Sequence, residues 1–354
     1  MTELLDRHDL LLADLDGTLY RGPSAVPGAV EAVAAAAARG IRTVYITNNA
    51  SRPPEAVAAH LVQLGFPARA ADVATSSQAA AALLARRLPA GSTVLVVGTD
   101  ALVAEVEAAG LTATREAGGA RAVVQGHDPG TGWSILAEAA VALRAGALWV
   151  ACNLDPTLPT ERGPLPGNGS MVAALRTATG RAPDVAGKPA PTLLRQAVER
   201  AGGRRPLVVG DRLDTDIEGG RAAGLATLLV LTGVTGPAEL LAAPAARRPD
   251  HIGADLRALR TDPAALAPGP RPGWTVEPGG EMLRLAATTA DADPLDALRA
   301  LCAAHWGNGG GPARVETGDP VAAAAVAALG LDATSAAARS TSVVGADPAP
   351  GDQP

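Results

Sequence analysis

Two aspartates follow the first apolar run of the chain, in the stretch Asp14-Leu15-Asp16-Gly17-Thr18. Side chains two residues apart in an extended chain face the same side, so Asp14 and Asp16 are expected to converge on one spot. Gly17 would let the backbone turn closely beneath them. Because adjacent carboxylates repel each other unless a cation or a shared proton relieves the repulsion, the pattern predicts proton-transfer or metal chemistry. A polar junction between a strand and a turn is the structural alternative.

A second polar segment, Thr47-Asn48-Asn49-Ala50-Ser51, follows another apolar run. Thr47 offers a hydroxyl, and backbone N–H groups at the start of a following helix would attract an anion. Capping of that helix by Asn49 or Ser51 explains the same residues without any ligand. On its own, the segment therefore indicates either an anion site or a helix start.

A third polar cluster follows a later apolar run and contains Asp211, Asp214 and Asp216. Asp211 comes directly after the predicted strand. Oxygen atoms from Asp14, Asp16 and Asp211 suit Mg²⁺, which prefers one or two carboxylates together with several waters. Capping of the next helix by Asp214 or Asp216 is a further interpretation of this segment.

Lys188 is the only lysine among the 30 basic residues of the chain, and all the others are arginine. Lysine is a compact ammonium on a flexible stem, whereas arginine is a planar fork, so a lysine kept in such a composition suggests a position that needs a point charge. Pro189 and Pro191 follow it and are placed to start a helix. We expect Lys188 to lie beside an anion.

Short apolar runs separated by helix-length segments are typical of buried parallel strands. The runs of the main sheet are residues 10–15, 42–47, 206–210 and 227–231. A second set lies between the second and third of these, at residues 94–98, 122–125 and 148–151. The pattern predicts an α/β protein, with a Rossmann-like doubly wound parallel sheet interrupted by a smaller α/β insertion. All four polar segments then fall at the carboxyl side of one sheet, where such folds bind ligands.

Taken together, these segments resemble the four signature motifs of the haloacid dehalogenase superfamily of aspartate-nucleophile phosphatases. About 30 residues separate the first two segments and about 140 separate Thr47 from Lys188, which places the insertion after the second signature strand. This layout resembles the type IIA (NagD-like) subclass, whose inserted α/β cap is of the C2 type. The resemblance covers residues 8–255. Among these phosphatases it is nearest to an actinobacterial glycerol-3-phosphate phosphatase group that carries a GNAT-like extension.

The resemblance, together with the composition of the C-terminal part, gives a domain organisation, which we state as a prediction. It comprises a core over residues 1–79 and 186–260, a cap over 80–185, a Pro/Gly-rich linker over 261–273, a small α/β extension over 274–335 and a disordered tail over 336–354. Two strands, near 274–277 and 282–286, and two Ala-rich helices are expected in the extension. Its glycine-rich run 307–312 lacks the pattern of a coenzyme A pyrophosphate loop, so we expect a structural or regulatory appendage without acyl transfer. Cys302 and His305 are expected to be packing residues, because two ligands do not make a zinc site.

The resemblance also implies roles for the motif residues. Asp14 would attack the phosphorus and become an aspartyl phosphate, and Asp16 would act as the general acid and then the general base. Mg²⁺ would be held by Asp14, Asp16 (through its backbone carbonyl) and Asp211. Thr47, the Asn48 amide and Lys188 would bind the phosphate. Asp216 would orient Lys188 or a metal-bound water.

Substrate choice is assigned to the cap. Asn153 and Asp155 resemble the cap loop of the subclass and are candidates for hydrogen bonds to substrate hydroxyls; a turn before Pro156 is an equal alternative. Leu158 stands where pyridoxal phosphatase relatives tend to carry histidine, which weakens that substrate. Ser170 is expected to cap the next helix.

Composition narrows the class of protein. The net charge of −6 and the absence of basic runs longer than a pair make nucleic acid an unexpected partner. No apolar stretch is long enough to span a membrane, the start of the chain is polar, and two cysteines are too few to stabilise a chain of this size by disulfides. We expect a cytoplasmic enzyme that acts on a small phosphorylated metabolite and leave a homodimer open.

The favoured substrate is glycerol 3-phosphate, followed by 2-phosphoglycolate or a sugar phosphate. Two alternative functions are considered. A phosphotransferase or mutase would use the same four segments. A non-catalytic binding protein would be expected to have lost Asp14, Asp16, Lys188 or Asp211, and all four are present.

Overall fold

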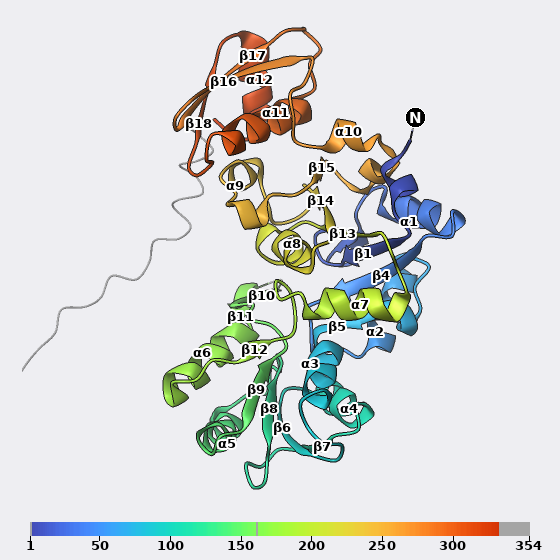
Figure 1. The fold of residues 1–354 in the computed structure, drawn as a ribbon, viewed down its shortest axis with the longest axis vertical. Coiled ribbons are helices and arrows are strands. Elements are labelled where there is room, and N and C mark those ends of the chain that lie inside the picture. Colours follow the sequence, from blue (N-terminus) through green and yellow to red (C-terminus); the bar gives the residue numbers. More distant parts are fainter. Residues whose placement is uncertain (1, 161, 333–354) are drawn as a thin grey trace, which may run out of the picture. The chain divides into compact units, whose positions relative to one another are not determined.

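The computed structural model describes residues 2–160 and 162–332. The chain forms two compact units (Figure 1). The first comprises residues 1–234 and 246–265, and the second comprises residues 235–245 together with the chain from 266 onward. The predicted tail at 336–354 lies outside the described residues. Each unit is considered separately below.

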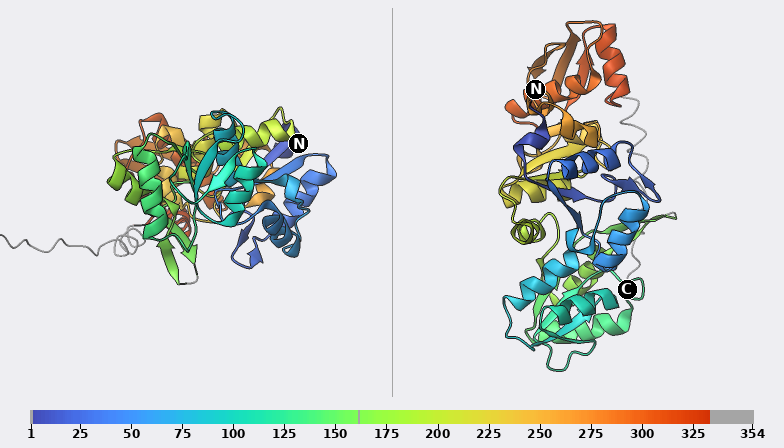
Figure 2. Two further views of the ribbon diagram at one scale, coloured as in Figure 1. Left: turned by 90° about the horizontal axis from the view of Figure 1, so that it is seen from below. Right: turned by 90° about the vertical axis from the view of Figure 1, so that its right-hand side faces the viewer.

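The first unit is built on a parallel sheet with the strand order β15-β14-β13-β1-β4-β5. The bounds of these strands are β1 (Leu10–Asp14), β4 (Arg42–Thr47), β5 (Val73–Thr75), β13 (Pro206–Gly210), β14 (Ala226–Val230) and β15 (His251–Gly253). The helices beside them are α1 (Ala29–Ala38), α2 (Pro54–Gln63), α7 (Thr192–Ala201) and α8 (Glu218–Ala223). Consecutive β1 residues Leu10, Leu11 and Leu12 are all buried, because both faces of the sheet are covered, as Figure 2 also shows.

The strand order reverses between β1 and β13. From β1 the chain moves outward through β4 and β5, and from β13 it moves in the opposite direction through β14 and β15. Such a reversal leaves a crevice at the carboxyl ends of the two central strands. Asp14 ends β1 and Asp211 follows β13, so both stand at this crevice.

A second parallel sheet, in the order β12-β9-β8-β6-β7, belongs to the inserted segment. Its strands are β6 (Thr93–Val97), β7 (Thr112–Thr114), β8 (Ala122–Gln125), β9 (Leu148–Ala151) and β12 (Asp184–Val185). Its helices are α4 (Asp100–Ala108), α5 (Trp133–Arg144) and α6 (Asn168–Thr179). We call this inserted segment the cap. One apolar cluster runs from Leu10 and Val44 of the main sheet to Val94 and Val124 of the cap.

The helix α3 (Ser76–Ala85) joins the two sheets, since it contacts both β5 and β8. The expected border between residues 79 and 80 therefore lies inside a continuous helix. Apolar residues on α3, such as Ala79 and Leu84, are fully buried in the shared cluster. The chain thus passes from the core into the cap through a packed helix.

The first unit also contains two short hairpins, of which the second lines the pocket described below. One pairs β2 (Tyr20–Arg21) with β3 (Ser24–Ala25) just after the first aspartate segment. The other pairs β10 (Thr157–Thr160) with β11 (Gly163–Pro166) in the cap.

The second unit contains a three-stranded sheet in the order β16-β17-β18. It is formed by β16 (Trp274–Gly279), β17 (Met282–Ala287), β18 (Arg314–Thr317), α11 (Pro294–Gly307), α12 (Pro320–Ala328) and α9 (Pro237–Leu241), and α10 (Pro263–Leu266) precedes it. The two expected strands and two helices are present, together with the unforeseen β18. Cys302 and His305 lie buried in α11, as expected for packing residues.

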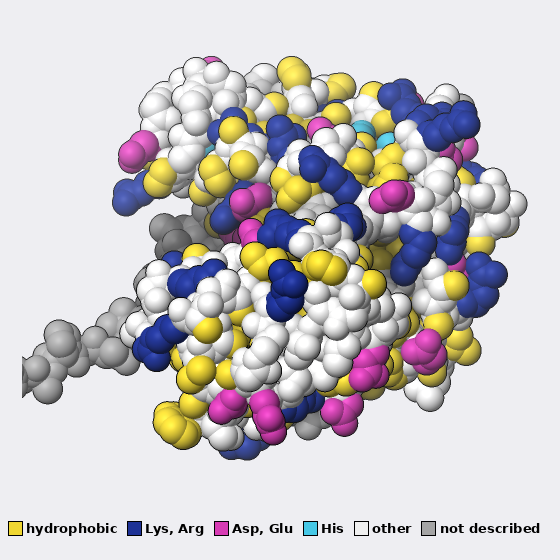
Figure 3. Space-filling view, turned by 60° about the horizontal axis from the view of Figure 1, so that its bottom comes forward, with side chains coloured by type: hydrophobic (Ala, Val, Ile, Leu, Met, Phe, Trp, Pro, Cys, Tyr) yellow, Lys and Arg dark blue, Asp and Glu magenta, His cyan; other side chains and the backbone are white. Residues whose placement is uncertain are grey.

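The surface carries charged side chains of both signs, as the near balance of 30 basic and 36 acidic residues in the sequence leads one to expect. Basic and acidic side chains are interspersed over the face seen in Figure 3. In the described part of the chain, no helix combines the length and apolar character that crossing a membrane requires.

Candidate active site

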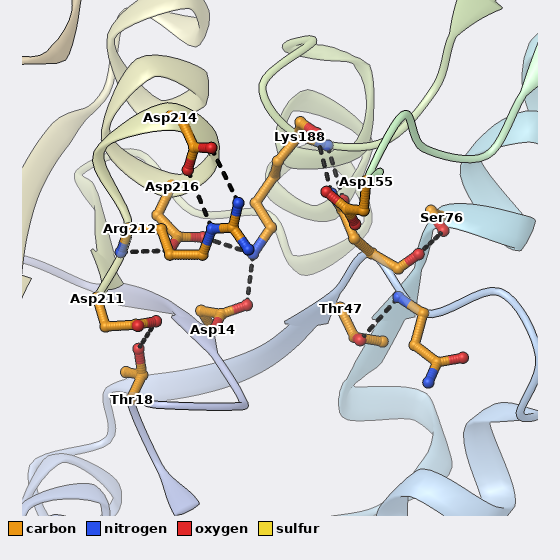
Figure 4. Close-up of polar contacts among 12 residues, drawn as sticks. Asp14, Thr18, Thr47, Ser76, Asp155, Lys188, Asp211, Arg212, Asp214 and Asp216 are labelled. Carbon is orange, nitrogen blue, oxygen red and sulfur yellow. Dashed lines mark hydrogen bonds and ion pairs between the residues drawn. The ribbon is translucent and has the colours of Figure 1, made fainter. Parts of the chain in front are cut away.

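Lys188 lies between two carboxylates at the crevice (Figure 4). Its Nζ is 2.5 Å from Asp14 Oδ1 and 2.6 Å from Asp216 Oδ1. The lysine and Asp216 are only 3% and 1% exposed, whereas Asp14 keeps 15% of its side-chain surface accessible. The ammonium is thus fixed from both sides, and Asp14 is the member of the trio that an incoming molecule can reach.

Asn48 places the backbone of Lys188. Its side-chain Oδ1 accepts from the Lys188 N–H at 2.9 Å, and its Nδ2 donates to the Lys188 carbonyl at 2.9 Å. A side chain at Gly187 would clash, because a Cβ there would lie 2.6 Å from Asn48 Oδ1. We expected only the backbone amide of Asn48 to act, and the structure adds this side-chain role.

Asp211 is fully buried at the end of β13 and is held by two donors. The Thr18 hydroxyl donates to Oδ1 at 3.3 Å, and the Val234 N–H donates to Oδ2 at 2.7 Å. The backbone at Gly17 and Gly233 presses against the carboxylate, since a Cβ would lie 2.5 Å and 1.9 Å from Asp211 Oδ2. Gly17 has φ +84°, which favours glycine independently. Gly17 therefore leaves the space that the Asp211 carboxylate occupies.

The electrostatics of this cluster show an excess of negative charge. Burial and the neighbouring Asp216 carboxylate raise the pKa of Asp14, and the Lys188 ammonium only partly opposes this. Burial and Asp216 likewise raise the pKa of Asp211. Burial alone would lower the pKa of Lys188, but the carboxylates of Asp14 and Asp216 outweigh it and raise that pKa. One ammonium does not balance three buried carboxylates.

A divalent cation fits this arrangement. Oxygen atoms of Asp14, Asp211 and Asp216 lie within 4.8 Å of one another. Asp216 already spends Oδ1 on Lys188 and Oδ2 on the Arg212 N–H at 3.1 Å. The arrangement suits a hard cation such as Mg²⁺, and Asp14 and Asp211 stay the predicted carboxylate ligands, with Asp216 beside Lys188.

Thr47 ends β4 beside the lysine, buried and facing the same pocket. Its Oγ1 accepts from the Asn49 N–H at 3.0 Å, which leaves its own proton available for an anion. The helix expected directly after Thr47 is absent, because α2 begins only at Pro54. Asn49 and Ser51 do not cap it: Asn49 Oδ1 accepts from the Ser51 N–H at 2.8 Å within a local turn.

A pocket of about 230 Å³ opens above these groups. Asp14, Asp16, Thr47 and Lys188 line its core side. The side chain of Asp16 is exposed and does not join the carboxylate cluster beneath it. Asp14 and Asp16 share the pocket, as expected, but in different environments: Asp14 contacts the Lys188 ammonium, and Asp16 is exposed at the pocket surface.

The cap contributes the opposite wall of the pocket through Asn153 and Asp155. Asn153 Oδ1 accepts from the Asp155 N–H at 3.2 Å, which is the turn considered from the sequence. Its Nδ2 donates to the Asn48 carbonyl at 2.7 Å, so both ends of the amide have protein partners. Asp155 receives one long bond of 3.4 Å from Asn48, and burial raises the pKa of its carboxyl. Substrate contact stays a prediction for both residues.

Several pocket residues were not foreseen from the sequence. Arg212 pairs with Asp214 through two bonds of 2.9–3.0 Å and lines the pocket, so Asp214 fixes an arginine instead of capping a helix. His127 and Asn168 also line it. The signal for Arg212 was its position next to Asp211. The expected cap at Ser170 is wrong, because α6 already begins at Asn168 and the Ser170 hydroxyl donates to the Pro156 carbonyl.

Comparison with known proteins shows the family to which the chain belongs. Residues 11–112 match the haloacid dehalogenase-like hydrolase family, and residues 185–259 match a second model of the same type, described as HAD-hydrolase-like. The D-glycerol 3-phosphate phosphatase of Mycobacterium tuberculosis is 52% identical over 339 residues, which are 92% of this chain and 95% of that protein. The chain belongs to the haloacid dehalogenase-like hydrolases.

Solved structures of other members of these hydrolases share its fold. The glycerol phosphate phosphatase of M. tuberculosis in complex with magnesium has a TM-score of 0.88 and 52% identity, covering 94% of this chain and all of that one. The 4-nitrophenylphosphatase of Thermotoga maritima has a TM-score of 0.68 and 33% identity, covering 73% of this chain and 98% of that one. Residues 271–331 match a GCN5-related N-acetyltransferase-like domain, which confirms the GNAT-like nature of the extension.

Proposed function

We propose that the chain is a Mg²⁺-dependent phosphatase that hydrolyses a small phosphomonoester through an aspartyl-phosphate intermediate, with glycerol 3-phosphate as its substrate. The observation that carries the chemistry is the buried Lys188 ammonium held between Asp14 and Asp216, beside Asp211. The identity of 52% with D-glycerol 3-phosphate phosphatase over nearly the whole chain supports the choice of substrate.

The reaction assigns separate tasks to the two aspartates. A carboxylate oxygen of Asp14 forms a bond to phosphorus while the bond from phosphorus to the substrate oxygen breaks, and Asp16 gives its proton to the departing alkoxide. A water molecule then attacks the aspartyl phosphate, Asp16 takes a proton from it, and the bond from phosphorus to Asp14 breaks. The accessible position of Asp16 above Asp14 suits this exchange of a proton with both leaving group and water.

The residues around Asp14 compensate the charge of the phosphate dianion. Lys188 neutralises Asp14, while Thr47 and the Asn48 amide are placed to donate to phosphoryl oxygens. A bound Mg²⁺ supplies further positive charge that offsets repulsion between nucleophile and phosphate. Asp14, the backbone carbonyl of Asp16 and Asp211 would hold it.

The wall opposite Asp14 supports a small, polar alcohol. Asp155 of the cap offers an acceptor to a substrate hydroxyl, and Arg212 of the core, held by Asp214, lines the same pocket. The pocket of about 230 Å³ is small for a ligand site. Closure of this wall would exclude water from the reacting centre. We assign hydroxyl recognition to Asp155, with Asn153 holding the loop.

Phosphate release from glycerol 3-phosphate, 2-phosphoglycolate and glucose 6-phosphate, each with Mg²⁺ or with EDTA, tests the proposal. We expect the highest kcat/KM for glycerol 3-phosphate and loss of turnover in EDTA. A phosphotransferase would give a phosphorylated product only when an acceptor alcohol is added, and a binding protein would release no phosphate. Turnover unaffected by EDTA would contradict the metal assignment.

Gly233→Ala should weaken Mg²⁺ binding. Its Cβ would lie 1.9 Å from Asp211 Oδ2, and the displaced carboxylate should raise the half-maximal Mg²⁺ concentration about fivefold or more, since overpacking commonly costs about 1–3 kcal/mol. Mg²⁺ titration of activity and calorimetric Mg²⁺ binding measure this. Gly118→Ala, where no atom lies within 4 Å, is the matched control. Equal Mg²⁺ affinity in both variants would contradict the role of Asp211.

A cytoplasmic location remains a proposal that follows from composition, and a homodimer stays open. The GNAT-like extension is proposed to be a structural or regulatory appendage. Within its unit it packs against α9, where the Trp306 indole N–H donates to the Leu241 carbonyl at 3.1 Å.

A further inference from the structure

Ser76 is a buried polar residue to which the site described above gives no role. It is the first residue of α3, the helix that passes from the core into the cap, and its side chain is fully buried. The start of α3 does not need its hydroxyl, because Thr75 Oγ1 already accepts from the Gln78 N–H at 3.2 Å and caps the helix. The Ser76 hydroxyl instead leaves the helix and donates to the Asn48 carbonyl at 2.6 Å (Figure 4).

The acceptor of this bond belongs to the segment that follows β4. The Asn48 carbonyl also accepts from Asn153 Nδ2 of the cap at 2.7 Å, so both lone pairs of its oxygen are used. The same planar peptide group carries the Asn49 N–H, which donates to Thr47 Oγ1 at 3.0 Å. The peptide group between Asn48 and Asn49 is therefore held at both ends.

This peptide group restricts the hydroxyl of Thr47. A hydroxyl has one proton and two lone pairs, and the Asn49 N–H takes one lone pair of Thr47 Oγ1, so the proton keeps only the remaining directions. Thr47 is 6% exposed and lines the pocket together with Lys188. If the peptide group turned, its N–H would leave Thr47 Oγ1 and the hydroxyl could rotate. The bond from Ser76 opposes that rotation.

We infer that Ser76 is a positioning residue for the Thr47 hydroxyl. It fixes the peptide group after Asn48, and that peptide group directs the Thr47 proton toward a phosphoryl oxygen. Ser76 has no accessible surface and acts without touching the substrate. The inference rests on the phosphatase function proposed above, because it concerns the phosphate site of the same reaction.

Ser76→Ala should weaken the hold on the phosphoryl group, whichever alcohol that group is attached to. We expect kcat/KM with Mg²⁺ to fall about fivefold for both glycerol 3-phosphate and p-nitrophenyl phosphate, the scale of one hydrogen bond between neutral groups. The Kd of orthovanadate, which resembles the transition state of phosphoryl transfer, should rise by a similar factor in calorimetry with Mg²⁺. A smaller folded fraction would lower turnover but would leave this Kd unchanged.

A double-mutant cycle tests the route through Thr47. Thr47→Val removes the hydroxyl and keeps about the size of the side chain, so adding Ser76→Ala to it should lower kcat/KM by less than about twofold. A role of Ser76 in folding alone would cost the same factor with and without the Thr47 hydroxyl.

Ser77→Ala is the matched control. Ser77 is the next residue, is 1% exposed, and shares a hydrogen bond of 2.8 Å with the Thr75 hydroxyl at the start of the same helix. It should leave kcat/KM and the Kd of orthovanadate near those of the unchanged protein. Ser76→Cys, whose thiol is a weaker donor at the same place, should lie between Ser76→Ala and the unchanged protein, and it replaces Ser76→Ala if that variant does not fold.

Four results would overturn the inference. They are an unchanged Kd of orthovanadate in Ser76→Ala, the same rise of that Kd in Ser77→Ala, a loss confined to glycerol 3-phosphate, and an equal loss in the Thr47→Val background. If the unchanged protein hydrolysed neither substrate, the proposed phosphatase function would itself fail, whereas the orthovanadate affinities of Ser76→Ala and Ser77→Ala would still decide the role of Ser76.

Discussion

Asp14→Asn should abolish phosphate release, with kcat lowered by at least about 10⁴-fold. The amide has the size of the carboxylate but cannot attack phosphorus, and it removes one of the proposed Mg²⁺ ligands. It also removes the negative charge from the side chain whose oxygen lies 2.5 Å from Lys188 Nζ. The measurement is kcat for glycerol 3-phosphate at saturating Mg²⁺.

Asp9→Asn is a matched control for that change. Asp9 precedes the opposite end of β1 and accepts from the Arg205 N–H at 2.8 Å, so the same exchange there touches the fold without touching the pocket. Its Tm should fall slightly while kcat stays near that of the unchanged protein. Undiminished turnover by Asp14→Asn would remove Asp14 as nucleophile.

Lys188→Arg should lower kcat/KM by about 100-fold or more, although the net charge is unchanged. The ammonium is 3% exposed and makes contacts of 2.5 and 2.6 Å on two sides, so a larger, planar guanidinium must displace Asp14 or Asp216. A shift of the nucleophile by even about 1 Å is costly in rate. The measurement is kcat/KM for glycerol 3-phosphate with Mg²⁺.

Arg204→Lys, the reverse exchange at an exposed position, should leave kcat/KM unchanged. Lys188→Met tests the charge itself, because it keeps the length of the side chain without the ammonium, and it should be at least as impaired. Near-normal activity of Lys188→Arg would show that the site accepts any cation, and the lone lysine would then be a coincidence of composition.

The main strands could be predicted because they are continuous apolar runs with covered faces. The runs at 10–15, 42–47, 206–210 and 227–231 agree with β1, β4, β13 and β14 to within a residue at either end. The edge strands β5, β7, β12 and β15 were missed because two or three residues carry no period. In the extension, β18 is missed for a different reason, since its sequence Arg-Val-Glu-Thr is mostly polar and exposed.

The site could be predicted in part. Asp14, Asp211 and Lys188 were predicted together because parallel strands deliver their carboxyl ends to one edge. The hydrogen bonds of Asn48 to Lys188, 140 residues away, leave no pattern in the sequence. Sequence spacing locates the groups that react, whereas the groups that hold them depend on tertiary contacts.

The most direct test of the account is to look for the phosphoryl group on the protein itself. Asp16→Asn should still form the intermediate from p-nitrophenyl phosphate but hydrolyse it slowly, because the base that activates water is missing. Acid-quenched protein, digested and analysed by mass spectrometry, should carry one added phosphoryl group on the peptide that contains Asp14. Release of p-nitrophenol with no phosphoryl group on Asp14 at any time point would contradict the central claim.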